Sequence, residues 1–173
     1  MLIGMDAMTV PSDGDIHSLT VLTARGIPWL DDLRCARVVT EELLRCEQES
    51  AVQSLAWLVL PDRVCWMLRR RNACLNRSMA LFKERSARAV QCAAERSGRV
   101  WQAGYQVYAI AAEDNPVELA MQLVQAPLRA GLCDRLDQYP HWYCRWRTPE
   151  MQMRNTSVTG QNSADARSAM AEA

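Results

Sequence analysis

Arg63 and Cys65 are the side chains whose types and spacing first suggest chemistry in this sequence. They stand one residue apart at the start of an apolar run, directly after the turn residues Pro61 and Asp62. Successive side chains of a strand point to opposite faces, so Arg63 and Cys65 should lie side by side on one face. The pair could be a working site, the remains of one, or an ordinary piece of surface.

Arginine is the second candidate for chemistry, because it gathers in the middle of the chain. Residues 63–101 hold nine Arg and Lys83 against Glu84 and Glu95, whereas residues 1–62 hold ten acids against four Arg. The formal net charge of the whole chain is nevertheless zero. The planar guanidinium suits phosphates and stacks on bases, and codon bias alone would not concentrate it in one segment, so we expect an anionic partner.

The longest helical pattern, over 75–96, separates arginines from an apolar stripe. At about 100° per residue, Arg77, Arg85, Arg88 and Arg96 fall within one arc beside the apolar residues. A solvated charged face would give the same pattern. The scarcity of acids within this segment favours phosphate binding.

The other metal-ligating residue types give little support for a metal centre. Seven cysteines form no CxxC pair, and His17 and His141 are the only histidines in the sequence. We therefore expect reduced thiols in a soluble cytoplasmic protein and no structural zinc site. No apolar run reaches the length that spans a bilayer, and the first residues lack a secretory-signal pattern.

Alternating strand and helix patterns must position these residues. Strands are expected over 18–23, 54–60, 64–68 and 106–110, and helices over 32–46, 75–96 and 115–125. The order β-α-β-β-α-β-α predicts an α+β fold, the ferredoxin-like split β-α-β antiparallel sheet with helices on one face and an added C-terminal helix. We expect a flexible N-terminus over 1–16, one domain over 17–147 and a disordered tail over 148–173.

Four segments resemble, in the same order and register, the REP-associated tyrosine transposases, a branch of the single-tyrosine HUH transposases. They read WLVLPDRVCWML (57–68), SGRVWQAGYQVYAI (97–110), QLVQAPLRAGLC (122–133) and DQYPHW (137–142). Members of that family hold Mg²⁺ or Mn²⁺ with two histidines one residue apart, and a tyrosine on a helix attacks the scissile phosphate. The resemblance implies an HUH-fold domain of the same kind here.

The resemblance also implies a degraded catalytic site. The two histidines match Arg63 and Cys65, and the tyrosine matches Gln122. Glutamine cannot be the nucleophile, and a guanidinium repels a metal ion. We therefore expect no catalytic residue, no metal and no cofactor, and a pseudoenzyme that binds single-stranded or hairpin DNA without cleaving it.

The expected binding surface combines cationic and aromatic side chains, with RNA as the alternative ligand. Trp66 is one further stacking candidate, although Trp66 and Trp101 are more often core residues. The expected nucleic-acid-binding residues are Arg63, Arg69, Arg70, Arg71, Arg77, Arg85, Arg88, Arg96, Arg99, Trp101, Tyr105 and Arg129.

Two other function classes stay open. One is a domesticated scaffold that binds a protein partner through the acidic N-terminal third. The other is an active transposase with a rearranged site, in which Tyr105, Tyr108 or His17 would take part. A homodimer is compatible with each of these hypotheses.

Overall fold

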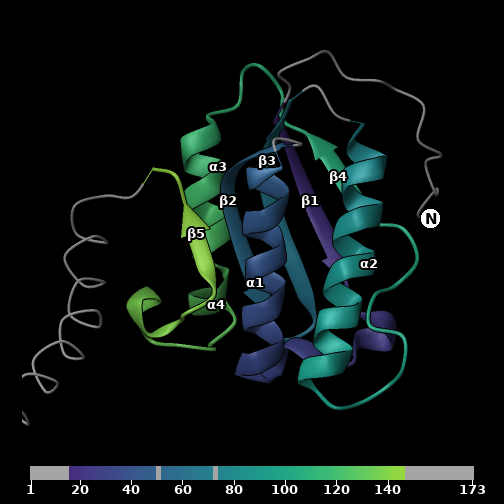
Figure 1. Cartoon of the computed structure of the whole chain (residues 1–173). Helices are drawn as coiled ribbons and strands as arrows, with labels where there is room; N and C mark the ends of the chain where they lie inside the picture. Colours follow the sequence, from purple (N-terminus) through teal and green to yellow (C-terminus); the bar gives the residue numbers. More distant parts are fainter. Residues whose placement is uncertain (1–15, 50–51, 72–73, 147–173) are drawn as a thin grey trace, which may run out of the picture.

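A five-stranded antiparallel sheet organises the computed structural model, which describes residues 16–49, 52–71 and 74–146 (Figure 1). The strand order is β4-β1-β3-β2-β5. The expected N-terminal and C-terminal flexible segments lie, apart from Ile16 at the start of β1, outside the described residues. The strands are β1 (Ile16–Leu22), β2 (Val52–Leu60), β3 (Arg63–Arg70), β4 (Gln106–Ala109) and β5 (Trp142–Cys144).

The helices follow the expected order, so the predicted α+β fold is confirmed. They are α1 (Leu33–Gln48), α2 (Leu75–Ala93), α3 (Pro116–Val124) and the short α4 (Ala126–Arg129). None of the helices in the described part of the chain is both long enough and apolar enough to span a membrane. The three-residue strand β5 was not predicted.

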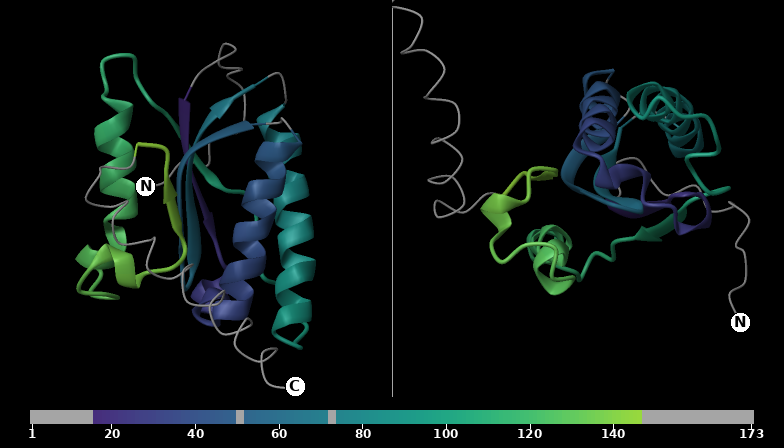
Figure 2. Two further views of the ribbon diagram at one scale, coloured as in Figure 1. Left: turned by 60° about the vertical axis from the view of Figure 1, so that its left-hand side comes forward. Right: turned by 90° about the horizontal axis from the view of Figure 1, so that it is seen from below.

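Helices α1 and α2 pack side by side on one face of the sheet (Figures 1 and 2). Helix α1 begins at Leu33 because the Asp32 carboxylate accepts a hydrogen bond from the Arg34 N–H at 2.8 Å. Beneath the two helices lies the larger core, in which the buried Trp66 and Phe82 rings stand 5.6 Å apart. This layer closes one face of the sheet.

The added helix α3 lies on the opposite face of the sheet (Figure 2). Asn115 caps it by accepting a hydrogen bond from the Val117 N–H at 3.0 Å, and Pro116 occupies the first turn, as its sequence predicts. Its buried residues Ala120 and Val124 pack in a second, smaller core with β2 and β5. Helix α3 therefore covers only the part of this face that β2 and β5 form.

Strand β2 contains a bulge between Ser54 and Ala56. Ser54 lies on the α1/α2 side, where its hydroxyl accepts a hydrogen bond from Trp66 Nε1 at 3.2 Å. Leu55 and Ala56 both belong to the core under α3, and Trp57 returns to the α1/α2 side. One extra residue in the strand thus keeps apolar side chains on both covered faces.

Candidate nucleic-acid interface

Arg63 and Cys65 lie next to each other on the sheet face that carries α3. Their neighbours Val64 and Trp66 belong to the core under α1 and α2, whereas Met67 belongs to the core under α3. The alternation of side chains along β3 therefore directs Arg63 and Cys65 to the α3 face, as expected. Both side chains are half-buried, so part of each is accessible to a ligand.

Asp62 holds the guanidinium of Arg63. Arg63 Nε and Nη2 donate to the two carboxylate oxygens of Asp62 at 2.9 and 2.8 Å. These hydrogen bonds and the charge of Arg63 lower the pKa of Asp62, so the carboxylate is ionised at neutral pH. The guanidinium is thus charged, oriented and paired across a partly exposed surface.

Cys65 is a weak ligand and a weak nucleophile in this position. Burial raises the pKa of its thiol, although a hydrogen bond with Thr20 and the charge of Arg63 oppose the shift. A protonated thiol neither attacks a phosphate nor ligates a metal well, and a guanidinium has no lone pair to offer. The pair does not fit the divalent metal that the resemblance implies. Within the described residues no group of three or more His, Cys, Asp or Glu side chains could hold a metal ion.

Gln122 lies apart from this pair. Ala120 and Val124, two residues away on either side along α3, are fully buried against the sheet, whereas Gln122 is exposed. At about 100° per residue Gln122 stands on the far side of the helix from them, so its side chain points away from the sheet. Its backbone carbonyl accepts a hydrogen bond from Arg129 Nη2 at 2.7 Å. The structure brings Arg63 and Cys65 together and leaves Gln122 outside.

His17 cannot join Arg63 and Cys65. It pairs with Leu68 across β1 and β3 and is 2% exposed on the α1/α2 side of the sheet. The alternative of a rearranged site that combines His17 with Arg63 and Cys65 is therefore not supported. The signal was available in the sequence, because His17 alternates with Leu19 and Val21 in one apolar stripe.

The two tyrosines near β4 have different surroundings. Tyr105 is half-buried, donates its hydroxyl hydrogen to Asn76 Oδ1 at 2.5 Å, and has a pKa raised by burial. It is therefore a poor nucleophile. Tyr108 pairs with Ser18 across β1 and β4 and is 63% exposed, so it offers an aromatic ring on the α3 face.

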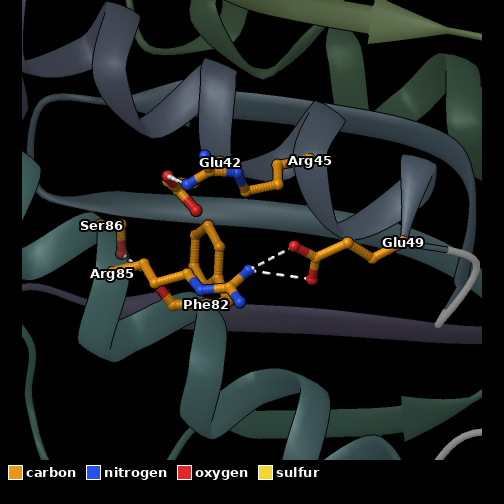
Figure 3. A network of polar contacts seen from close by, with 6 residues as sticks. All are labelled: Glu42, Arg45, Glu49, Phe82, Arg85 and Ser86. Atoms are coloured by element: carbon orange, nitrogen blue, oxygen red, sulfur yellow. Dashed lines mark hydrogen bonds and ion pairs between the residues drawn. The ribbon is translucent and has the colours of Figure 1, made fainter.

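Three of the four arginines expected on the long helix are already engaged. Arg85 Nη1 donates to both carboxylate oxygens of Glu49 at 2.8 and 2.9 Å (Figure 3). Arg88 pairs with Glu84 at 2.7 Å. Acids are scarce within 75–96, as counted in the sequence, but Arg85 is nevertheless paired, because the acidic end of α1 packs beside α2.

Arg96 does not belong to the helical face. Helix α2 ends at Ala93, and Glu95 adopts a left-handed conformation with φ of 50°. Arg96 instead covers the ring of Trp29, with its guanidinium carbon 4.0 Å from the ring centroid. Arg77 is exposed and has no ion-pair partner among the described residues.

The remaining expected contacts divide between surface and core. Arg69 and Arg71 are exposed and Arg70 is half-buried, all at the opposite end of β3 from Arg63. Trp101 is 4% exposed and donates its indole N–H to Ser86 Oγ at 3.0 Å, so no base can stack on it in this structure. The same holds for Trp66, which is fully buried. No pattern in the sequence predicted the contact between Trp101 and Ser86.

The fold is the feature that this chain shares with known proteins. No protein-family model matches the sequence, and no curated protein matches it. Among solved structures, the chain resembles a REP-associated tyrosine transposase bound to a REP hairpin. The TM-score is 0.64 and the sequence identity 13%, over 80% of this chain and 81% of that chain. At this identity the likeness establishes a shared fold.

A second solved structure is a candidate transposase from Deinococcus radiodurans R1. It has a TM-score of 0.49 and 18% sequence identity, over 72% of this chain and 97% of that chain. The likeness to the REP-associated tyrosine transposase structure gives this protein a transposase-like α+β fold, in which Arg63 and Cys65 lie side by side on one strand of the sheet.

Proposed function

We propose that this protein binds single-stranded or hairpin DNA through the α3 face of its sheet and does not cleave it. The observation that carries the proposal is the adjacency of Arg63 and Cys65 on the partly open face of a transposase-like fold. Arginine at this place supplies a cation and a forked donor, which are the groups that a backbone phosphate requires. The solved neighbour with a bound REP hairpin supports DNA as the ligand class.

Binding requires that a phosphate compete with Asp62 for the guanidinium of Arg63. The ion pair lies on a partly exposed surface, with side-chain exposures of 42% for Arg63 and 35% for Asp62. Pairs of this kind stabilise a protein by about 0–1 kcal/mol, so a phosphate can displace the carboxylate. Tyr108, exposed on the same face, is positioned to stack on an unpaired base.

Loss of cleavage follows from three substitutions in the matched positions. Arg63 and Cys65 do not make a metal site, and Gln122 has no nucleophilic oxygen and points away from them. Tyr105 keeps its proton, because burial raises its pKa and its hydroxyl is bonded to Asn76. The chain is, in this proposal, a degenerate relative of the REP-associated tyrosine transposases that needs no metal.

Anisotropy with a fluorescent DNA hairpin tests binding. Affinity should fall with salt, by a log–log slope of about 0.7 to 0.9 for each phosphate contact, and EDTA should leave it unchanged. A hairpin of the same sequence in RNA, an unrelated hairpin and an unstructured strand distinguish the ligand classes. Absence of binding to all of them would overturn the proposal.

A denaturing gel tests the absence of cleavage. After incubation with Mg²⁺ or Mn²⁺, the labelled hairpin should run at its full length, with no slower band from a covalent protein–DNA adduct. An adduct would show that a nucleophile survives. Phenylalanine substitutions at Tyr105 and Tyr108 would then locate it.

A protein scaffold is the second candidate, and the outer side of α1 favours it. Leu33 and Leu44 are 65% and 44% exposed, and at about 100° per residue they lie on the same side of the helix. Arg37 and Glu41, which form an ion pair at 3.2 Å, lie between them along the helix. A partner that docks here would be lost on Leu44→Ser, whereas DNA binding would be unaffected.

A further inference from the structure

A groove lies between α2 and the loop that leads to β4, away from the candidate interface. It has a volume of about 310 Å³, and its lining includes Lys83, Arg99, Gln91 and Gln102. Lys83 fixes the loop, since its Nζ donates to the carbonyl oxygens of Gln102 and Gly104 at 2.7 and 2.6 Å. The groove is therefore built by a lysine that connects helix and loop.

The groove concentrates positive charge without a carboxylate to balance it. Lys83 and Arg99 form no ion pair with any described residue, and the one acid in the lining, Glu84, is bound by Arg88 at 2.7 Å. Burial lowers the pKa of Lys83, and the positive charge of the nearby Arg99 lowers it further. Two cations held in mutual repulsion favour an anion between them.

Backbone carbonyl oxygens of the loop orient the side chains that line the groove and leave some of their N–H donors free for a ligand. Lys83 uses two of the three hydrogens of its ammonium group on the loop carbonyls. Arg99 uses Nε on the carbonyl of Trp101 at 3.0 Å, which leaves both η nitrogens for a ligand. Gln91 likewise donates to the carbonyl of Gly98 at 2.6 Å. These side chains are ordered before any ligand arrives, which lowers the entropic cost of binding.

The groove also lies at the same end of the sheet as Arg63. The Gln102 N–H donates to the carbonyl of Leu22 at 2.9 Å, and Leu22 is paired with Arg63 across β1 and β3. The loop and Arg63 are thus separated by two strand spacings of about 4.8 Å each. A nucleic-acid strand that passes round the β4 edge (Figure 1) can contact both places.

We propose that Lys83 and Arg99 bind a backbone phosphate of the nucleic acid that Arg63 contacts on the α3 face. This inference rests on the proposed function and adds a second, sequence-independent contact to it. The contact is made by two cations to a phosphate, a group that every nucleotide carries, so this contact anchors the strand and does not select its sequence.

Substitutions in the groove test the proposal on the full chain. Lys83→Gln and Arg99→Gln should each weaken hairpin binding on the order of tenfold, and each should lower the log–log salt slope by about 0.7 to 0.9. Lys83→Arg, which keeps the charge, should stay close to the wild-type affinity. The control is Arg37→Gln on α1, which removes one cation from an exposed surface outside the groove. Unlike Lys83 and Arg99, Arg37 is paired with an acid, Glu41, and its side chain is 79% exposed. Its affinity should change by less than about twofold.

Lys83 is the only lysine in the chain, which allows a test without substitution. Acetylation of the wild-type protein by a limiting amine-reactive reagent, read by mass spectrometry, should slow at Lys83 when the hairpin is bound. The α-amino group serves as the internal reference. This measurement separates a direct contact from an indirect effect of Lys83→Gln on the loop.

The outcomes separate this proposal from the proposed function. Unchanged hairpin affinity in both groove variants, with no protection of Lys83, would overturn the groove contact, while binding by the wild type would uphold the function. Failure of the wild type to bind any nucleic acid would overturn both. Weaker binding in the groove variants with an unchanged salt slope would also count against a phosphate contact.

Discussion

The two faces of the sheet differ in how completely they are covered. On one face α1 and α2 enclose Trp66, Phe82 and Trp101, which are all at most 4% exposed. On the other face α3 covers β2 and β5, while Arg63 and Cys65 on β3 are only partly buried. Because alternate residues of β3 serve the two faces, one strand carries both the main core and the candidate interface.

The arginines of the two faces also differ in what they contact. On α2, Arg85 is bound by a carboxylate of α1, and beyond the helix Arg96 covers a tryptophan, so both connect elements of the fold. On the α3 face, Arg63 is held by its own neighbour in the turn. An arginine-rich segment therefore does not by itself mark a binding surface, since what matters is which acids pack against it.

Aromatic truncation should give the largest difference between the faces. Trp66→Ala should lower the free energy of unfolding by about 3–5 kcal/mol, because it empties the core beside Phe82 and leaves Ser54 without its donor. Tyr108→Ala, on the exposed side of the other face, should cost less than about 0.5 kcal/mol. Urea titration measures both. Equal losses would mean that the α3 face is as closed as the other.

When hairpin affinity is measured instead of stability, removal of an arginine from the α3 face should have the larger effect. Arg63→Ala should weaken hairpin binding by about 1–3 kcal/mol, the scale of a hydrogen bond to a charged group. Arg85→Ala is the control, because Arg85 is also paired with a carboxylate but lies on the helix layer. Its affinity should change little. If Arg85→Ala weakened binding as much as Arg63→Ala, the nucleic acid would lie on α2 instead.

Introducing two histidines tests whether the α3 face lacks a metal site alone or a nucleophile as well. The double variant with Arg63→His and Cys65→His places two imidazoles side by side on β3 and should bind Mn²⁺. At tenfold excess over its dissociation constant, the metal should raise the free energy of unfolding by about 1.4 kcal/mol. The single variant Arg63→His is the control. No covalent DNA adduct should form, because Gln122 still points away and has no nucleophilic oxygen. An adduct would show that metal alone had been missing.

The smallest effect concerns Asp62. Asp62→Asn should lower the free energy of unfolding at pH 7 by less than about 1 kcal/mol and should strengthen hairpin binding, since Arg63 then has no carboxylate competitor. Arg63 lowers the pKa of Asp62 below 3.8, so this contribution is present above that pH and is lost as the pH falls through the lower, folded-state pKa. Urea titrations at pH 7 and below pH 4 should show that the wild type loses this part of its free energy of unfolding at low pH and that Asp62→Asn does not. Weaker hairpin binding by Asp62→Asn would mean that the carboxylate orients Arg63 for its ligand.

Local patterns predicted the elements well, because each had its own physical signal. Short apolar runs marked β1, β2 and β3, and the Asn115-Pro116 pair marked the start of α3. The alternation of side chains along a strand placed Arg63 and Cys65 on one face before their partners were known. Strand β5 gave no comparable signal, since three residues are too few to show a period and the strand is defined by its pairing with β2.

The site was less predictable, because its chemistry depends on contacts between distant segments. Glu49 and Arg85 are 36 residues apart, and Trp101 meets Ser86 only when the loop folds back on α2. The outward direction of Gln122 could have been inferred from the apolar spacing of Ala120 and Val124. The groove could not have been inferred from the sequence, although the sequence does show a single lysine among many arginines.

The bulge in β2 works as a phase shift in the strand's alternation. Ser54 and Trp57 share a face although they are three positions apart, because Leu55 and Ala56 together take the place of one residue in the alternation. Removal of Leu55 would return the strand to an unbroken alternation with Ser54, Trp57 and Val59 still in phase. Removal of Leu58, in the regular part, would put Val59 out of phase and turn it toward α3. A one-residue deletion in this central strand should therefore be accommodated at the bulge and disruptive a few residues later.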